Sequence, residues 1–224
     1  MRFNKIVTGH TIKSMITIHH LNNSRSQRVL WLLEELALEY KIKHYERDQK
    51  TMLAPESLRE IHPLGKSPVI TDDDLTLAES GAIIEYLVER YGEGRLAPKL
   101  GTKEHLRYKY WLHYSEGSAM PLLVMKLIFD NFGLGDSSAN REFVAPQIKL
   151  HFDYIESELA KNTWFVGEEF TAADVQMSFP LEAVAAQVGL DASHPQIMGF
   201  LERIHARPAY QRALERGGAY QLLT

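Results

Sequence analysis

Between Ile16 and Tyr91 the apolar residues switch repeatedly between the spacing of a strand and that of a helix. The segment 16–21 carries β-branched residues at alternate positions, which predicts a strand. From Ser26 to about Tyr40 apolar residues recur at helical spacing, which predicts a helix. A second short strand is expected over 42–45. These three elements have the order β-α-β.

The following residues extend this order. Pro55 to Ile61 allows a short helix, because proline is tolerated in a first helical turn. Residues 69–71 and 75–77 flank an acidic turn and predict a β-hairpin. A further helix is expected where one helical face carries Ile83, Ile84, Leu87, Val88 and Tyr91. The order β-α-β, short helix, β-β and α predicts a small α/β domain over residues 15–91.

The rest of the chain has a helical pattern. A linker rich in glycine spans 92–101, and residues 102–224 are predicted to form an all-helical domain. The long helical stretch 103–132 contains Gly117 and Pro121, where a bend is expected. Another helix is expected over 141–160. Because domain junctions are frequent ligand sites, we expect a cleft between the two domains.

The start of one helix in this second domain has a specific local signal. Thr171 and Asp174 have the spacing of a capping box. In a capping box, the side chain of each residue accepts a hydrogen bond from the backbone N–H of the other residue. A helix is therefore predicted to begin there. Two shorter terminal helices, 197–206 and 210–215, are expected on either side of Pro208.

Composition excludes several classes of function. The 224 residues include no cysteine, which removes disulfides, thiolate metal sites and a cysteine nucleophile of the protein's own. A net charge of −4 with mixed signs argues against a nucleic-acid binder. No apolar run approaches the roughly 20 residues that span a bilayer, so no membrane association is expected. Residues 1–14 make a poor signal peptide and are interpreted as an N-terminal extension. A cytoplasmic protein fits this composition.

The ten histidines do not indicate a metal site. His19 and His20 are adjacent on a predicted strand, so their side chains point to opposite faces. No HExxH or similar ligand spacing occurs in the sequence. We therefore expect no bound metal.

Three short motifs could carry chemistry. In the first, Ser24 lies where a strand leads into a helix, and a hydroxyl there can donate to an anion with help from the helix N-terminus. In the second, a cis bond at Ser67–Pro68 would turn backbone groups outward to pair with an extended peptide. In the third, Glu79–Ser80 begins a helix and suits an α-amino-acid head group. Taken singly, each motif is better explained as a plain helix cap or an ordinary trans proline.

Taken together and in this order, the motifs resemble the glutathione-binding half of the glutathione transferases, in particular the serine-type, theta-like enzymes of bacteria and fungi. The resemblance extends from about Ile16 to Thr224 and includes the capping segment 170–174. In those enzymes a serine four residues before an arginine activates the thiol, and Ser24 and Arg28 have that spacing. The resemblance implies a thioredoxin-like N-terminal domain, an all-helical C-terminal domain, glutathione as co-substrate and a homodimer.

The resemblance also implies roles for individual residues. Ser24 corresponds to the serine that activates the thiol, and Ser67–Pro68 to the cis-proline pair. Glu79–Ser80 corresponds to the anchor of the γ-glutamyl group. Lys66 occupies a position that often approaches the glycyl carboxylate.

The sequence departs from the family pattern at two places. Leu53 stands where many theta-like relatives carry a histidine near the glycyl end, which puts the contacts at that end, Lys66 included, in question. Asn23, beside Ser24, is a rival thiol donor, because some bacterial relatives use asparagine. We rank Ser24 first.

A second substrate would lie over the helical domain. Aromatic and methionine residues crowd the expected bend, and such a stripe is either protein core or the lining of an apolar pocket; the candidates are Tyr110, Trp111, Tyr114, Met120, Leu123 and Met125. The leading functional hypothesis is conjugation of glutathione to small, mostly apolar electrophiles. A glutathione-dependent peroxidase or disulfide reductase on the same fold is the alternative, and a non-catalytic transferase-like module is a third reading. The sequence does not distinguish between conjugation and reduction.

Overall fold

The structure is a computed structural model, and it describes residues 15–51 and 53–223. The extension predicted at 1–14 lies outside the described residues. The N-terminal half contains a four-stranded mixed sheet in the order β2-β1-β3-β4. Strands β1 (Ile16–Leu21) and β2 (Tyr40–Tyr45) are parallel, whereas β3 (Val69–Asp72) pairs antiparallel with both β1 and β4 (Leu75–Ala78).

Two helices cover one face of this sheet. Helix α1 (Ser26–Glu35) connects the parallel strands β1 and β2, and α2 (Ser80–Tyr91) follows the hairpin. Both bury their apolar residues in the main core, which continues into the helical half. On the other face, Leu21, Tyr45 and Leu58 form a small separate cluster. This arrangement is a thioredoxin-like domain, as the sequence predicts.

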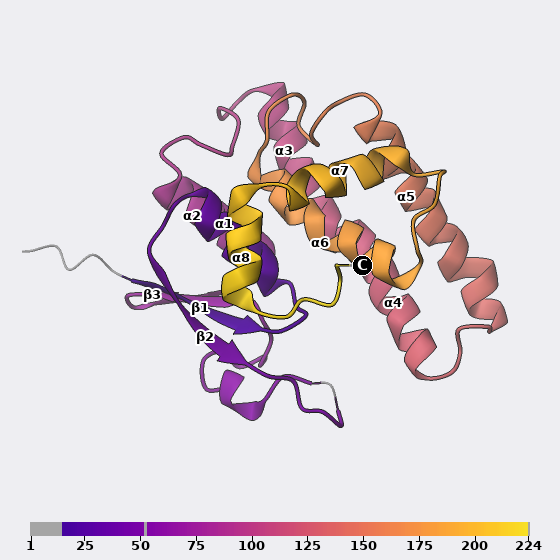
Figure 1. The fold of residues 1–224 in the computed structure, drawn as a ribbon, viewed down its shortest axis with the longest axis horizontal. Helices are drawn as coiled ribbons and strands as arrows, with labels where there is room; N and C mark the ends of the chain where they lie inside the picture. The colour runs from indigo at the N-terminus through magenta and orange to yellow at the C-terminus, as the bar shows by residue number, and fades with distance from the viewer. Residues whose placement is uncertain (1–14, 52, 224) are drawn as a thin grey trace, which may run out of the picture.

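The second half is all helical (Figure 1). The bend expected near Gly117 and Pro121 is a π-helical turn, η2 (Ser115–Ala119). It joins α3 and α4 in one continuous helical path, and a second π-helical turn, η3, precedes α5. The remaining helices are α3 (Lys103–Tyr114), α4 (Met120–Asn131), η3 (Asn140–Val144), α5 (Ala145–Leu159), α6 (Ala172–Gln187), α7 (Pro195–His205) and α8 (Pro208–Gly217). No helix in the described part of the chain is both long and apolar enough to cross a membrane.

Helix α8 returns to the N-terminal half and packs along α1, as Figure 1 shows. Three arginines tie the two helices together. Arg207 donates two hydrogen bonds to Glu35, at 2.6 and 2.9 Å. Arg212 and Arg216 reach Glu34 at 2.8 and 2.9 Å. The chain end after α8 is thereby directed back toward the residues that precede α1.

Three predicted elements are wrong in their boundaries. The helix expected over 26–40 ends at Glu35, because the chain turns through Ala37 at φ 54° and Tyr40 begins β2. The short helix expected at 55–61 is a single 3₁₀ turn, η1 (Glu56–Leu58). Pro208 begins α8 instead of lying between two helices, as expected for proline in a first helical turn.

The capping box at the start of α6 is present, as predicted. Asp174 is fully buried and accepts hydrogen bonds from the backbone N–H groups of Phe165, at 2.8 Å, and Thr171, at 2.7 Å. Burial raises the pKa of Asp174 to about 6, although these hydrogen bonds oppose the shift. The carboxylate therefore fixes both the start of α6 and the loop before it.

We predict that Asp174→Ala lowers the free energy of unfolding by about 3 kcal/mol, because it leaves two buried N–H donors without an acceptor. Urea unfolding at neutral pH measures this loss. Asp191→Ala is the matched control, since Asp191 also accepts a backbone bond, from Ser193, but its side chain is 82% exposed. The control is expected to lose less than about 1 kcal/mol. Equal losses in the two variants would contradict this account of α6.

Candidate active site

A cleft of about 410 Å³ lies between the loops of the sheet domain and the helical domain. Polar residues from the first domain line one part of it, namely Asn23, Ser24, Arg25, Arg47, Lys66 and Ser67. The helical domain and the chain end contribute Met120, Val124, Leu127, Phe179, Ala183, Gln187 and Leu222. Three apolar residues of the first domain also line it, namely Leu21, Leu53 and Ala54. The cleft is therefore mostly polar where the first domain contributes and mostly apolar where the second does.

The Ser24 hydroxyl is the donor of a small hydroxyl cluster. Its neighbour Ser67 donates to the backbone carbonyl of His19, at 2.9 Å, and accepts a hydrogen bond from Ser24 Oγ, at 3.5 Å. Its other neighbour, Ser26, lies 2.8 Å away and has His20 Nδ1, at 2.7 Å, as an acceptor. Burial, with His44 nearby, lowers the pKa of His20 to about 4, so its neutral ring can accept that proton.

Ser24 itself accepts a backbone hydrogen bond from the N–H of Ser26, at 3.2 Å. Ser26 is the first residue of α1, so Ser24 Oγ lies at the positive end of the helix dipole. Ser67 donates to the His19 carbonyl, and Ser26 can donate to the Leu21 carbonyl, 3.2 Å away. The Ser24 hydroxyl can therefore exchange its long bond to Ser67, at 3.5 Å, for one to a ligand in the cleft. Ser24 is 6% exposed and lines the cleft.

Asn23, the rival donor, has its side-chain amide engaged by the chain end. Asn23 Nδ2 donates to Gln221 Oε1 at 2.9 Å, and Asn23 Oδ1 accepts from the Gln221 backbone N–H at 2.8 Å. Arg47 donates to the Asn23 carbonyl at 3.2 Å. Both polar atoms of the amide are thus already bonded in this structure.

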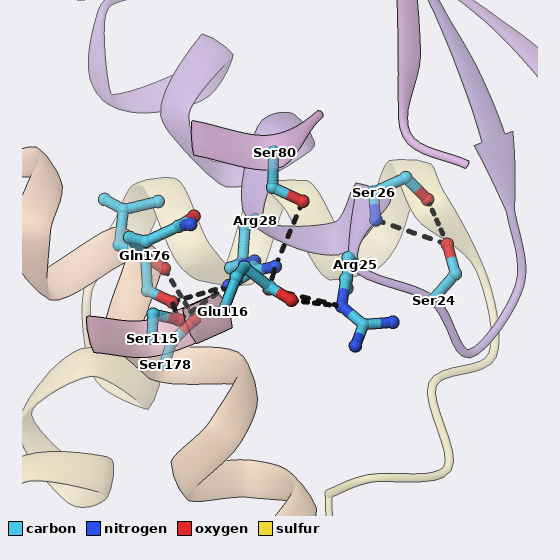
Figure 2. A network of polar contacts seen from close by, with 10 residues as sticks. Ser24, Arg25, Ser26, Arg28, Ser80, Ser115, Glu116, Gln176 and Ser178 are labelled. Atoms are coloured by element: carbon cyan, nitrogen blue, oxygen red, sulfur yellow. Dashed lines mark hydrogen bonds and ion pairs between the residues drawn. The ribbon is translucent and has the colours of Figure 1, made fainter. Parts of the chain in front are cut away.

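Arg28 lies at the centre of a buried polar network that joins the two domains (Figure 2). Its side chain is 1% exposed and makes an ion pair with Glu116 of η2. It also donates to the backbone carbonyl of Gln176 at 2.6 Å and to Ser80 Oγ at 3.1 Å. Burial lowers the pKa of Arg28, and the charge of Glu116 opposes that shift. One guanidinium thereby holds α1, α2, η2 and α6 together.

Arg25 extends this network to the cleft. Its Nε donates to both carboxylate oxygens of Glu116, at 3.2 and 2.9 Å. The guanidinium carbons of Arg25 and Arg28 lie 5.5 and 5.3 Å from the ring centroid of Phe179. The pKa of Arg47 is lowered by burial and by the charge of Arg25, so the two cations are close enough to repel each other. With Lys66, they make the polar part of the cleft attractive to anions.

The structure brings some of the predicted site residues together and separates others. Ser24, Lys66 and Ser67 line one cleft. The Ser67–Pro68 peptide bond is cis. Glu79 and Ser80 do not line this cleft, but Arg28 connects Ser80 to it from the first turn of α1. Ser80 does not cap α2 with its side chain; the N-cap is Glu79, which is exposed and has φ 71°.

The predicted lining of a second-substrate pocket needs correction. Met120 lines the cleft, but the other five candidates, Tyr110, Trp111, Tyr114, Leu123 and Met125, do not. Leu123 is fully buried core. Tyr114 is hydrogen bonded to His151, at 2.6 Å, and Tyr110 to Tyr154, at 3.1 Å, in an aromatic cluster that also contains Trp111. The π-helical turn between α3 and α4 interrupts the regular 3.6-residue spacing, so a stripe predicted from that spacing does not stay on one face across it.

Sequence reasoning missed several residues of the site. Some of them had a signal in the sequence that could have identified them, and others had none. Glu116 lies beside Gly117, where a bend was expected, and an acidic residue there could have been paired with Arg28. Phe179 lies on α6, which is buried along most of its length and shows no single apolar stripe. Arg47 and Leu222 carry no sequence signal that links them to Ser24. Only the folded chain brings them to the cleft.

The side chains of His19 and His20 point to opposite faces of the sheet, as expected for neighbours on a strand. His19 contacts Tyr45 and Thr71 at 2.9 and 3.4 Å, whereas His20 faces Ser26 of α1. Residues 15–51 and 53–223 contain no group of three or more histidine or acidic side chains able to hold a metal ion.

Comparison with known proteins decides the family. The model of the glutathione S-transferase N-terminal domain matches residues 13–89, and that of the C-terminal domain matches residues 123–208. Glutathione S-transferase 3 of Schizosaccharomyces pombe is 36% identical, over 90% of this chain and 88% of its own. The chain belongs to the glutathione S-transferase family.

Two further relatives of this transferase bear on its activity. The crystal structure of a glutathione S-transferase from Actinobacillus pleuropneumoniae has 40% sequence identity and a TM-score of 0.84, and covers 93% of this chain and 95% of that one. The disulfide-bond oxidoreductase YfcG of Escherichia coli is 27% identical, over 89% of this chain and 94% of its own. Similar folds in this family therefore include a protein named for disulfide chemistry.

We predict that Glu116→Gln lowers the free energy of unfolding of this transferase by about 3 kcal/mol at neutral pH, because it leaves the buried Arg28 charge without a counter-charge. Burial of Glu116 raises its pKa, but Arg28 and Arg25 outweigh this and hold the pKa below the usual 4.5. The stabilisation is therefore present above pH 4.5 and is lost as the pH falls through the lower folded-state value.

Denaturant unfolding measured between pH 7 and pH 3 checks this prediction. The difference in the free energy of unfolding between wild type and Glu116→Gln should become smaller as the pH falls toward 3. Glu56→Gln, which breaks an exposed ion pair with Arg59, is the control and should cost less than about 1 kcal/mol. A gap for Glu116→Gln that stays constant with pH would show that charge is not the cause.

Proposed function

We propose that this protein conjugates glutathione to small, mostly apolar electrophiles, as a serine-type transferase in which Ser24 stabilises the glutathione thiolate. The observation that carries the proposal is the direction of the hydroxyl cluster. Ser67 and Ser26 can donate to the backbone carbonyls of His19 and Leu21, so the Ser24 proton, which reaches Ser67 only at 3.5 Å, is available to the cleft. Ser24 also lies before the first turn of α1, where a negative charge is favoured.

The energies are sufficient for this role. A free thiol with a pKa of about 8.5 is only slightly ionised at neutral pH. Lowering that pKa by about two units requires ~2.7 kcal/mol of preferential stabilisation of the thiolate. One charge-assisted hydrogen bond contributes ~1.5–3 kcal/mol and a helix N-terminus a further ~0.3–1 kcal/mol. Ser24 and α1 together can therefore keep the sulfur deprotonated.

Charge supports the placement of the rest of glutathione. The tripeptide has two carboxylates and one ammonium group, and we assign the glycyl carboxylate to the positive region around Lys66. The main chain of Ser67–Pro68 pairs with the extended backbone of the ligand. The γ-glutamyl head lies against Glu79 and Ser80 at the start of α2, where the carboxylate meets the helix N-terminus and the ammonium group meets Glu79.

The proposed reaction balances without a cofactor. The thiol proton leaves to solvent, and a sulfur lone pair forms the new carbon–sulfur bond. With an alkyl halide the carbon–halogen bond breaks and halide leaves with its electron pair. With an activated alkene the electron pair of the double bond takes up a proton from water. The apolar wall of Met120 and Phe179 supplies a place for such electrophiles.

Reduction of disulfides is the second candidate function, and the similarity to the disulfide-bond oxidoreductase of E. coli favours it. In that reaction the thiolate attacks one sulfur of a disulfide and the other sulfur leaves as a thiolate. A second glutathione then closes the exchange and yields oxidised glutathione. Peroxide reduction would use the same thiolate. Activity toward an alkyl halide and toward 2-hydroxyethyl disulfide, compared at equal enzyme concentration, separates the candidates. Retention on immobilised glutathione without any turnover would instead favour a non-catalytic module.

Family membership supports two further expectations that we include in the proposal. The protein acts as a homodimer in the cytoplasm, in the detoxification of electrophiles. Its glutathione-binding domain spans residues 15–91 and is joined by the linker 92–101 to the electrophile-binding domain, 102–224.

We predict that Ser24→Ala raises the pKa of the bound thiol by about 1–2 units, because the thiolate loses one charge-assisted hydrogen bond. The ultraviolet absorbance of the thiolate, titrated with glutathione bound, measures the shift. Turnover at pH 7 should fall about tenfold or more while the Kd for glutathione changes little. Asn23→Ala is the comparison variant. If its thiol pKa rises and that of Ser24→Ala does not, the role belongs to Asn23.

We also predict that Glu79→Gln weakens glutathione binding about tenfold, because the ammonium group loses a charged partner. Calorimetric titration measures the Kd. Glu93→Gln is a matched control, since Glu93 is also exposed and has a similar backbone conformation, with φ 52°. An unchanged Kd for Glu79→Gln would place the ammonium group elsewhere.

A further inference from the structure

Arg25 places a positive charge beside the apolar part of the cleft. It is the N-cap residue of α1 and directly follows Ser24 in the chain. Its side chain is 31% exposed and lines the cleft, and its guanidinium carbon lies 5.5 Å from the ring centroid of Phe179 on α6. Among the described residues that line this cleft there is no acidic side chain. The charge of Arg25 is therefore open to a ligand in the cleft.

The carboxylate that holds Arg25 is shared with a second arginine. Glu116 accepts hydrogen bonds from Arg25 Nε, at 2.9 and 3.2 Å, and also forms the ion pair with Arg28. Since one carboxylate cannot neutralise two guanidinium groups, one positive charge of this cluster remains uncompensated. Arg28 is 1% exposed, so a ligand can reach that charge only at Arg25.

The guanidinium of Arg25 also has donors left for a ligand. Only its Nε takes part in the bonds to Glu116. Within residues 15–51 and 53–223 neither terminal nitrogen, Nη1 or Nη2, has a hydrogen-bond partner, and Figure 2 shows both directed away from Glu116. Paired N–H donors in one plane match the two oxygens of a carboxylate.

The apolar surroundings of Arg25 indicate what such a carboxylate is attached to. In the arrangement proposed above, glutathione has its glycyl carboxylate near Lys66 and its γ-glutamyl head at the start of α2, so neither end needs Arg25. The helical part of the cleft, which includes Met120 and Phe179, is mostly apolar. A second substrate that fits both features has an apolar body and one anionic group.

We propose that the preferred electrophiles of this transferase carry a carboxylate on an apolar body, and that Arg25 is the specificity-determining residue that binds this carboxylate. The inference rests on the proposed function and names its substrate class. Nη1 and Nη2 of Arg25 donate to the carboxylate, while the apolar body lies against Met120 and Phe179. The thiol proton leaves to solvent, the sulfur lone pair forms the carbon–sulfur bond, and the leaving group departs with its electron pair. The carboxylate keeps its charge throughout.

Pairs of electrophiles that differ in charge but not in shape test this assignment. One pair is 4-(chloromethyl)benzoate and 4-(chloromethyl)benzamide, and the other is the corresponding pair of 3-substituted isomers. Each kcat/KM is divided by the rate constant of the uncatalysed reaction with glutathione, which corrects for intrinsic reactivity. The wild type should prefer the acid over the amide by about tenfold in at least one pair. Arg25→Gln should remove this preference, and Arg25→Lys, which keeps the charge but not the paired donors, should retain part of it.

The acid-to-amide ratio is taken within each variant, so a loss of folded protein or of thiol ionisation cancels. Arg207→Gln is the matched control, because the Arg207 side chain is 29% exposed and paired with Glu35 but does not line the cleft. It should keep the wild-type ratio. In the wild type, the preference should also weaken as the ionic strength rises, a test that needs no variant.

Two results would overturn this inference and leave the proposed function intact. One is a wild type that conjugates acid and amide equally well in both pairs. The other is an acid preference that persists in Arg25→Gln, which would assign the carboxylate to another cation of the cleft. Wild-type protein that binds glutathione but conjugates neither acid nor amide would overturn the proposed function as well.

Discussion

The arrangement of this molecule depends on one buried charge, the Arg28 guanidinium. A charge at 1% exposure is tolerated only with a counter-charge and with acceptors for its protons, and here they come from different parts of the chain. Glu116 comes from the π-helical turn, the Gln176 carbonyl from α6 and the Ser80 hydroxyl from α2. Since Arg28 lies one turn after Ser24, satisfying this charge also places the start of α1 against the helical domain.

The function that we propose uses a thiol, although the site contains no cysteine. The protein has none, so a reactive thiol must arrive with a ligand. What the chain supplies is a hydroxyl proton, a helix N-terminus and a positive surrounding, each of which favours an anion over the neutral thiol. These groups act weakly one by one. Their effect depends on being held in fixed positions, and the polar network around Arg28 and the ties between α1 and α8 hold them.

Local signals in the sequence predicted most of the fold. The strands, the hairpin and the α6 capping box depend on neighbouring residues, and the structure confirms them. The helix ending at Glu35 was predicted too long, because Tyr40 falls on the helical stripe by spacing but belongs to β2. The lining of the cleft could not be predicted in this way. Periodicity identifies an apolar face but not what it packs against, and Tyr110 and Tyr114 proved to belong to an aromatic cluster.

The part of the site that local patterns could not predict is also the part that can vary independently. Ser24 and its hydroxyl partners are fixed by the sheet domain, whereas Met120, Phe179 and Leu222 come from the helical domain and the chain end. A change in the second set alters the apolar part of the cleft and leaves the hydroxyl cluster around Ser24 in place. Gln221 bonds to Asn23, so the chain end is held at the residue directly before Ser24. The hydroxyl cluster and the apolar lining are therefore built by different parts of the chain, which are joined at the Asn23–Ser24 turn and through the Arg28 network.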